Sequence, residues 1–172
     1  MNQNWHIETQ AVQAGYRPGN GEPRTLPLYQ STTYKYDDAQ SVADLFDLKS
    51  EGFFYTRLAN PTVDAFEKKM AALEGGVAAV AVSAGQTASM LAILNIARAG
   101  DHIVAVASLY GGTVSLFTNT FSKLGIEFTF VQPDADSETV RKAIRPNTKA
   151  IFAETLANPA LIVLDIERFA GI

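Results

Sequence analysis

Four short apolar segments, separated by stretches with helical periodicity, constrain the fold of this chain more than any other feature. The apolar segments span residues 77–82, 102–107, 126–131 and 150–153, and the helical patterns span 86–98, 113–124 and 137–144. The apolar segments are continuous more than alternating, which is typical of strands buried on both faces. Strand, helix and strand joined by short connections indicate parallel pairing through right-handed crossovers. We therefore expect an α/β fold, with helices on both faces of a mainly parallel sheet.

Residues 1–60 have much less regular structure in their pattern. The elements expected there are a short helix at 9–14 that stops at Gly15, a loop at 17–23, an extended stretch at 26–36 and a helix at 41–49 with Ser41 as its N-cap. Asn60 and Pro61 then supply the N-cap and first-turn proline of a helix that ends at Gly75 and Gly76. Residues 1–60 thus form a long segment with few elements, which is typical of an arm that packs on the rest of the chain or on a second subunit.

Composition excludes several classes of function. The 172 residues carry a net charge of −4, whereas a protein that binds a phosphate backbone needs a basic surface, so we expect no nucleic-acid partner. Cysteine is absent, which rules out disulfides, thiolate metal sites and a cysteine nucleophile. The two histidines, His6 and His102, lie far apart and lack the short spacing of a zinc site, so no metal is expected.

The sequence also bears on location and completeness. Its N-terminus lacks the basic start and apolar core of a signal peptide, and its most apolar stretch, 84–97, is too short to span a bilayer. We therefore expect a cytoplasmic protein with no membrane partner. A last helical pattern begins near Leu164 and stops at Ile172 without a final strand, which indicates a truncated or cleaved chain.

In open parallel sheets, ligands bind at the carboxyl ends of the strands, so the loops there hold the candidate site residues. Gly85 and Gln86 begin a helix after the first expected strand, and free amides at a helix start can bind an anion. Tyr110 follows the second strand and could stack on a planar ligand, and Asn158 follows the fourth. Each feature has a structural alternative: an ordinary strand-to-helix turn, a tyrosine packed at the sheet edge and an Asx-turn, respectively.

A further cluster, 54–62, lies outside the sheet. Tyr55 and Arg57 alternate along a segment that we expect to be extended, so their side chains share a face. Arginine is suited to bidentate phosphate binding, although a surface arginine beside a core tyrosine would give the same pattern.

These weak signals occur together and in a recognisable order. The motifs are Tyr55-x-Arg57-x-x-Asn60-Pro61-Thr62, Ser83-x-Gly85-Gln86, Tyr110-Gly111-Gly112-Thr113 and Glu154-Thr155-x-x-Asn158-Pro159. They resemble the pyridoxal-phosphate (PLP) enzymes of cysteine and methionine metabolism, which include cystathionine synthases and lyases, methionine γ-lyase and O-acetylhomoserine sulfhydrylase. The stretches 8–16 and 27–34 are most similar to the sulfhydrylase branch. The resemblance covers nearly all of this chain but less than half of a family member.

The resemblance implies a fold like that of aspartate aminotransferase (fold type I), with residues 1–60 as an N-terminal arm that contacts a neighbouring subunit and 61–172 as the first part of the PLP-binding large domain. It implies that Gly85 and Gln86 donate backbone amides to the cofactor phosphate. Tyr110 would stack on the pyridine ring and take part in catalysis. Asn158 would hydrogen-bond the ring hydroxyl, and both Asn158 and Tyr110 would lie near the substrate. The family usually has proline where this chain has Leu156.

The resemblance also implies a role for the N-terminal arm. Tyr55 and Arg57 would reach the cofactor phosphate of a neighbouring subunit, since family members are tetramers made of two tight dimers with shared active sites.

The implied reaction is a γ-replacement, in which acetate leaves O-acetylhomoserine and sulfide or a thiol adds, giving homocysteine or methionine. Methionine γ-lyase and cystathionine γ-synthase are sister alternatives with the same motifs, and a non-catalytic scaffold with this fold is an alternative of another class. The family's Schiff-base lysine lies beyond the matching region, and none of the lysines here has its sequence surroundings: Lys35, Lys49, Lys68, Lys69, Lys123, Lys142 and Lys149. We therefore expect this chain alone to be inactive.

Overall fold

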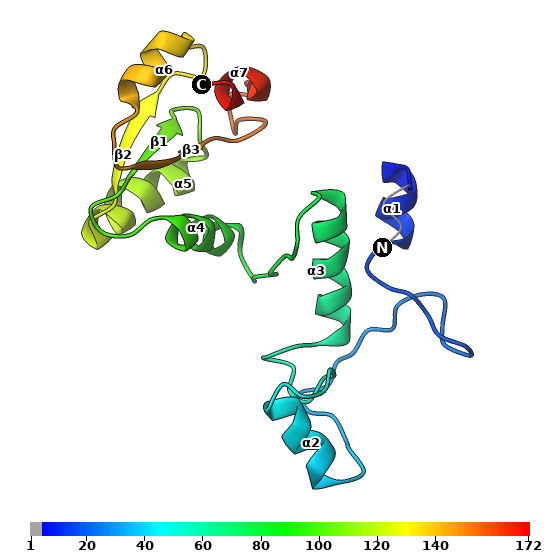
Figure 1. Ribbon diagram of the computed structural model, residues 1–172. Coiled ribbons are helices and arrows are strands. Elements are labelled where there is room, and N and C mark those ends of the chain that lie inside the picture. The colour runs from blue at the N-terminus through cyan, green and yellow to red at the C-terminus, as the bar shows by residue number, and fades with distance from the viewer. Residues whose placement is uncertain (1–4) are drawn as a thin grey trace. The chain divides into compact units, whose positions relative to one another are not determined.

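The computed structural model describes residues 5–172 and divides into two compact units, one ending at Ala81 and the other running from Val82 to Ile172. The first unit holds three helices, α1 (Ile7–Gln13), α2 (Ala39–Phe46) and α3 (Pro61–Leu73), joined by long irregular segments (Figure 1). Its buried side chains are few and scattered: Ala14, Leu45, Asn60, Ala65 and Ala71. This unit therefore has little core of its own, as the sparse pattern of residues 1–60 indicates.

The helix boundaries of the first unit follow local capping chemistry. Asn60 caps α3, its side chain accepting a hydrogen bond from the Thr62 amide, and Pro61 is the first helical residue, as expected. The expected N-cap of α2 is wrong, because Asp38 accepts the hydrogen bond from the Ser41 amide at 2.7 Å and the helix begins at Ala39. Asp38 and Ser41 both suit a cap, and the carboxylate is the stronger acceptor for a backbone amide.

A close backbone approach joins α1 to α3. Gly15 ends the α1 segment with φ +89°, and a Cβ there would lie 2.1 Å from the carbonyl oxygen of Ala65. Lys69 donates to the carbonyl of Val12 across the same contact. Only glycine fits this position, both because of its positive φ and because of the space that remains.

The second unit is built on a three-stranded parallel sheet. Its elements are α4 (Gly85–Ile96), β1 (His102–Val106), α5 (Gly111–Ser115) continuing into a π-helix (Leu116–Phe121) and a 3-10 turn (Ser122–Leu124), β2 (Glu127–Val131), α6 (Ser137–Ala143), β3 (Thr148–Phe152) and α7 (Ile166–Ala170). The strand order is β2-β1-β3, and β1 pairs in parallel with both neighbours. The expected α/β fold and three of the four expected strands are thus confirmed.

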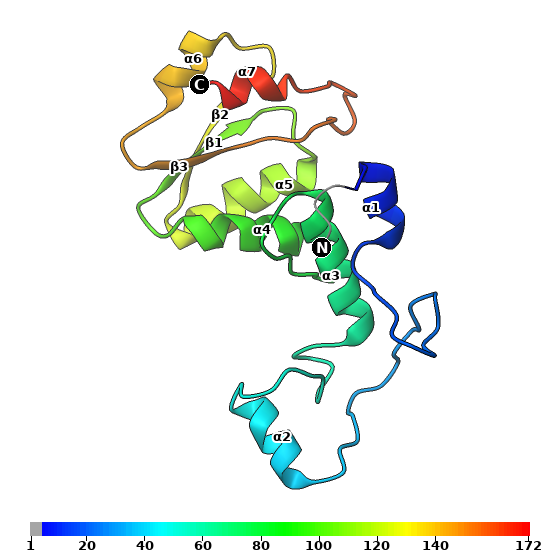
Figure 2. The same cartoon turned by 45° about the vertical axis from the view of Figure 1, so that its right-hand side comes forward.

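Helices cover both faces of this sheet (Figure 2). Ile103 and Ala105 of β1 point toward α4 and the π-helical stretch after α5, where Phe117 stacks on Phe128 with ring centroids 4.3 Å apart. Val104 and Val106 point to the opposite face and pack with residues of α6 and α7. All five residues of β1 are buried, which explains why this strand is continuously apolar after its first residue.

The expected first strand, residues 77–82, is wrong. This segment is irregular, and Val77 and Val80 are exposed. A strand needs a hydrogen-bonding neighbour, and the described sheet consists of β2, β1 and β3, none of which pairs with this segment. The Ala81 amide instead donates to the carboxylate of Glu67 at 2.7 Å. Apolar composition alone therefore overpredicts a strand here.

A buried polar cluster lies at the amino ends of the three strands. The His102 side chain is fully buried, with Nδ1 2.7 Å from Thr148 Oγ1 and Nε2 2.9 Å from Thr129 Oγ1. Arg145 donates to the same Thr129 hydroxyl and to the carboxylate of Glu127. This cluster lies at the end of the sheet opposite the carboxyl ends of the strands, so it stabilises the fold apart from the candidate site residues of the strand-end loops.

Stability should depend on pH through His102. Burial, and then the positive charge of Arg145, lower the pKa of this imidazole, while Glu127 acts in the opposite direction. Because the folded-state pKa lies below the unfolded value of about 6.5, the neutral ring contributes stability that is fully present above that pH and is lost as the pH falls through the folded pKa. We expect the unfolding midpoint to fall between about pH 8 and about pH 5, and to fall less in a His102→Gln variant.

The matched control is His6→Gln, which removes an exposed histidine. That variant should keep the wild-type pH profile. Equal pH dependence of the wild-type protein and His102→Gln would contradict the role assigned to the buried ring.

Candidate functional site

The amino end of α4 leaves backbone donors open. Gly85 is the first helical residue, and the N-cap Ala84 offers no side-chain acceptor, whereas α2, α3, α6 and α7 are each capped by an Asp or Asn side chain. The amides of Gly85, Gln86 and Thr87 therefore have no acceptor within residues 5–172, and the space beside Gly85 is open. Three free amides at the positive end of a helix dipole can bind an anion such as a phosphate.

The Gln86 side chain joins α4 to α5. Its Nε2 donates to the hydroxyl of the buried Thr113 at 3.2 Å, and its Oε1 is buried without a hydrogen-bond partner among the described residues. A buried acceptor without a donor is costly, so it marks a position where a further donor is expected. The side-chain amide of Gln86 thus lies at the same end of α4 as the free backbone donors.

Tyr110 occupies the N-cap position of α5, four residues after the end of β1. Its carbonyl accepts hydrogen bonds from the amides of Thr113 and Val114. Its ring lies against Gly112, where a Cβ would come within 2.5 Å of the ring, and the residue is 47% exposed. The absence of a side chain at Gly112 therefore makes room for the Tyr110 ring, and the exposed part of the ring is available to a ligand.

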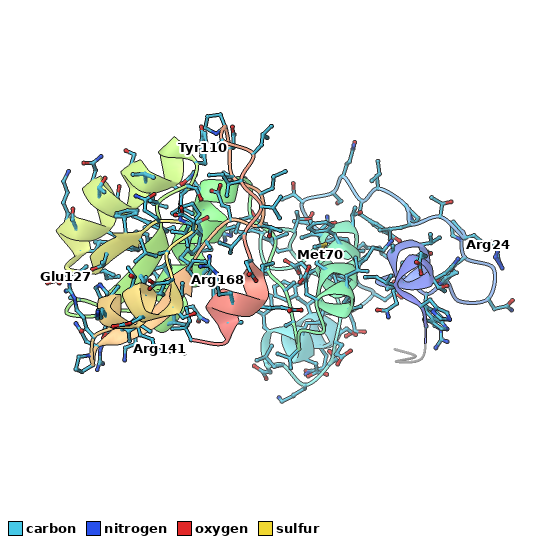
Figure 3. The ribbon with its side chains drawn as sticks, turned by 90° about the horizontal axis from the view of Figure 1, so that it is seen from above. Arg24, Met70, Tyr110, Glu127, Arg141 and Arg168 are labelled. Carbon is cyan, nitrogen blue, oxygen red and sulfur yellow. The ribbon has the colours of Figure 1, made fainter. Side chains whose placement is uncertain are left out.

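Glu154 holds the backbone of Tyr110. Both carboxylate oxygens of Glu154 accept from the Tyr110 amide at 3.1 Å, which connects the loop after β1 with the loop after β3. Tyr110 is labelled in Figure 3. The sequence indicates this contact only through the place of Glu154 in the Glu154-Thr155 motif, because the two partners are 44 residues apart.

Asn158 lies in a turned-back loop after β3. The loop is closed by hydrogen bonds between Ala157 and Ile162 and between Leu164 and Thr155, and by a bridge from Leu156 to Val163. Asn158 itself is exposed, and its side chain has no hydrogen-bond partner within the described residues. Its amide group is therefore free to donate and accept, and the Asx-turn alternative finds no matching hydrogen bond.

Tyr55 and Arg57 lie in the first unit, and the structure brings them together. The Arg57 guanidinium carbon lies 5.1 Å from the centre of the Tyr55 ring, a cation–π distance. The backbone turns here, since the Leu58 amide donates to the Tyr55 carbonyl, and the expected extended segment is wrong beyond the bridge that pairs Tyr55 with Thr33. Arg57 is exposed, and no carboxylate of residues 5–172 forms an ion pair with it.

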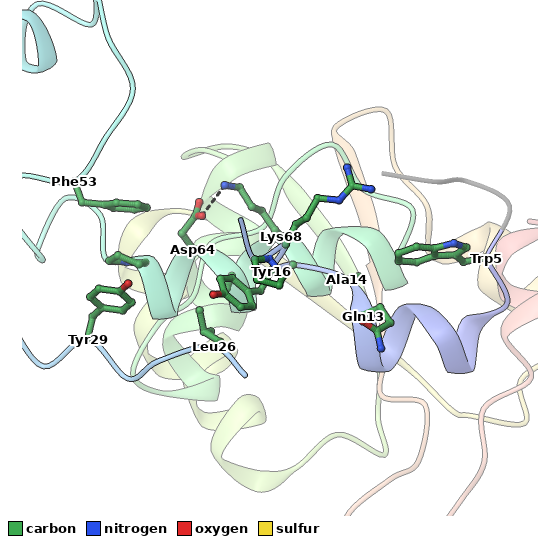
Figure 4. Close-up of a pocket in the computed structure, with 14 residues that line it drawn as sticks. Trp5, Gln13, Ala14, Tyr16, Leu26, Tyr29, Phe53, Asp64 and Lys68 are labelled. Carbon is green, nitrogen blue, oxygen red and sulfur yellow. Dashed lines mark hydrogen bonds and ion pairs between the residues drawn. The ribbon is translucent and has the colours of Figure 1, made fainter. Parts of the chain in front are cut away.

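A pocket of about 790 Å³ also lies in the first unit (Figure 4). Aromatic side chains line much of it, among them Tyr16, Tyr29 and Phe53, and the ion pair between Asp64 and Lys68 closes one side. None of the six residues expected to bind the cofactor or substrate lines this pocket.

Two further features bear on the class of protein. No group of three or more metal-binding side chains is present in the part of the chain that the structure describes. None of the helices in residues 5–172 has the length and apolar character needed to cross a membrane.

Comparison with known proteins assigns the chain to a family. Residues 8–172 match the model of the family described as "Cys/Met metabolism PLP-dependent enzyme". The chain is 52% identical over 167 residues to an O-acetyl-L-homoserine sulfhydrylase of Leptospira meyeri, and 48% identical over 169 residues to one of Corynebacterium glutamicum. These alignments cover 96% and 98% of this chain, but 38% and 39% of the relatives. The chain thus spans about two fifths of their length.

Solved structures agree with this assignment. The crystal structure of an O-acetylhomoserine (thiol)-lyase from Campylobacter jejuni, with N'-pyridoxyl-lysine-5'-monophosphate, matches with a TM-score of 0.82 at 36% identity, over 95% of this chain and 40% of that one. That of metB from Corynebacterium glutamicum matches with a TM-score of 0.85 at 36% identity, over 99% of this chain and 43% of that one. The family match extends through both structural units. The chain belongs to the family of PLP-dependent enzymes of cysteine and methionine metabolism.

Proposed function

We propose that this chain is the N-terminal part of a PLP-dependent γ-replacement enzyme that makes homocysteine or methionine from O-acetylhomoserine and sulfide or a thiol. The observation that carries the proposal is its identity of about one half to two O-acetyl-L-homoserine sulfhydrylases across nearly its whole length. Residues 1–60 would form an arm that contacts a neighbouring subunit, and residues 61–172 would form the first part of the large domain.

The open donors of the second unit suit the family's cofactor. The free amides of Gly85 and Gln86 at the amino end of α4 would hold its phosphate group, since no side chain of residues 5–172 accepts from these donors. Tyr110, half exposed on the loop after β1, would stack on its ring. Asn158 is exposed, and its side-chain amide has no hydrogen-bond partner within the described residues, so it would hydrogen-bond the ring hydroxyl and lie near the substrate carboxylate.

When bound, PLP would supply an electron sink that allows protons to be removed from carbon atoms near the amino-acid nitrogen. The residues of this chain would orient the reacting groups and transfer one of these protons. The Tyr110 hydroxyl can accept and donate a proton, and stacking keeps this hydroxyl close to the substrate carbons. Asn158, near the substrate carboxylate, would help to orient the substrate.

Arg57 and Tyr55 would complete the site from a neighbouring subunit. Arg57 is exposed without a carboxylate partner in residues 5–172, and its guanidinium is oriented by the ring of Tyr55, so it can form charge-assisted hydrogen bonds with a phosphate. The assembly would be a homotetramer of two tight dimers, acting in the cytoplasm. This chain on its own would be inactive, because the family's Schiff-base lysine lies outside it.

An assay of the full-length enzyme tests the proposed reaction. With O-acetylhomoserine and sulfide we expect homocysteine and acetate, and with methionine alone we expect no methanethiol. Release of methanethiol without turnover of the acetyl ester would instead favour methionine γ-lyase. Use of O-succinylhomoserine and cysteine would favour cystathionine γ-synthase. PLP binding without turnover of any of these substrates would favour a non-catalytic scaffold.

A further inference from the structure

The hydrogen bond between Glu154 and Tyr110 has a geometry that can control the position of the Tyr110 ring. Glu154 follows β3 after one residue, and its two carboxylate oxygens straddle the Tyr110 amide, each at 3.1 Å. Glu154 is half-buried and makes no ion pair within residues 5–172, so this amide is the one protein donor that its carboxylate has there.

Tyr110 otherwise has few restraints. The glycines at 111 and 112 follow it directly and add no side-chain packing, the ring lies against Gly112, and the residue is 47% exposed. Its backbone carbonyl is fixed by the start of α5, whereas its amide, among the residues that the structure describes, bonds only to Glu154. The direction of the Cα–Cβ bond, and hence of the ring, thus depends on both ends of the residue being held.

We propose that Glu154 is a positioning residue for Tyr110, and that its carboxylate sets the orientation of the ring that stacks on the cofactor. The inference rests on the proposed function of Tyr110. A carboxylate suits the place for two reasons: it forms a charge-assisted hydrogen bond with a backbone amide, and its negative charge lies at the amino end of the helical segment that begins with α5.

Cofactor binding by the full-length protein gives a readout that does not require turnover. Titration of the apo-protein with PLP should show about threefold to tenfold weaker binding in Glu154→Ala, since part of the stacking contribution is lost. The induced circular dichroism of bound PLP should also decrease, because a mobile ring no longer imposes a fixed asymmetry. Glu154→Gln keeps an acceptor oxygen and should largely restore both readouts.

The control is Asp136→Ala, which removes another carboxylate that bonds a backbone amide, that of Thr139, at a helix start in the same unit. This variant loses a cap of the same chemical kind, so any general loss of stability is reproduced without a change at Tyr110. Its PLP affinity and circular dichroism should equal those of the wild-type protein.

A double-mutant cycle decides whether Glu154 acts through Tyr110. In a Tyr110→Ala background, Glu154→Ala should cause no further loss of PLP affinity, because the ring that it positions is gone. Additive losses would overturn the proposal, and so would an unchanged affinity in Glu154→Ala or in Tyr110→Ala alone. These readouts are independent of substrate, so a protein that binds PLP but does not convert O-acetylhomoserine would overturn the proposed reaction and leave the role of Glu154 standing.

Discussion

Replacement of Tyr110 by phenylalanine should lower turnover of O-acetylhomoserine by about 10²–10⁴-fold in the full-length enzyme, with little change in PLP affinity. Phenylalanine keeps the aromatic face, so the stacking contribution of about 0.5–1.5 kcal/mol remains. It removes only the hydroxyl, which is the group proposed to exchange a proton with the substrate. The measurements are steady-state kinetics and a PLP titration of the apo-protein.

Tyr110→Ala separates the two roles, because it removes both the ring and the hydroxyl and should lower both PLP affinity and turnover. The control is Tyr16→Phe, which removes a hydroxyl that bonds the Pro23 carbonyl in the first unit and should leave both quantities unchanged. If Tyr110→Phe kept full activity, the proton-transfer role would be lost and stacking alone would remain. If the phenylalanine and alanine variants behaved alike, neither role would stand.

The strands that are buried on both faces of the sheet could be predicted from the sequence. The expected segments at 102–107, 126–131 and 150–153 correspond to β1, β2 and β3, because apolar composition is continuous where helices cover both faces. The segment at 77–82 has the same composition but remains irregular. Apolar composition indicates that a segment can be buried. A strand also needs a hydrogen-bonding neighbour, and this neighbour comes from a distant part of the sequence.

The helices show a similar division between local and non-local information. The start of α3 follows from the local cap of Asn60 and Pro61 and was predicted correctly. The pattern at 113–124 was predicted as one helix, and it contains a π-helical stretch from Leu116 to Phe121. Phe117 and Phe121 are both fully buried against the sheet, and a helical period places both residues on the same side whichever hydrogen-bond spacing the backbone adopts.

The candidate site was only partly readable. Gly85, Gln86, Tyr110 and Asn158 could be proposed because each follows a segment expected to be a strand, and ligand sites in parallel sheets lie at such loops. The contact between Glu154 and Tyr110 could not be predicted in this way, since it is a hydrogen bond across 44 residues. The packing of the Tyr110 ring on Gly112 likewise follows from side-chain direction rather than from spacing.

Arg57→Ala should weaken PLP binding by about tenfold to a hundredfold in the full-length enzyme, which corresponds to the roughly 1.5–3 kcal/mol of a charge-assisted phosphate contact. The guanidinium is exposed, lies 5.1 Å from the centre of the Tyr55 ring and has no carboxylate partner in residues 5–172. Its charge is therefore available to an anion. The affinity is measured by titrating the apo-protein with PLP.

Two further variants identify what Arg57 contributes. Arg57→Lys keeps the positive charge but loses the planar fork that binds phosphate with two parallel hydrogen bonds, so its affinity should lie between those of the wild-type protein and Arg57→Ala. Arg24→Ala removes another exposed arginine of the first unit and should bind PLP as the wild-type protein does. Equal affinities of Arg57→Ala and the wild-type protein would rule out the phosphate contact. An equal loss in Arg24→Ala would mean that the first unit acts on PLP only through its overall charge, because neither arginine would then have a specific partner.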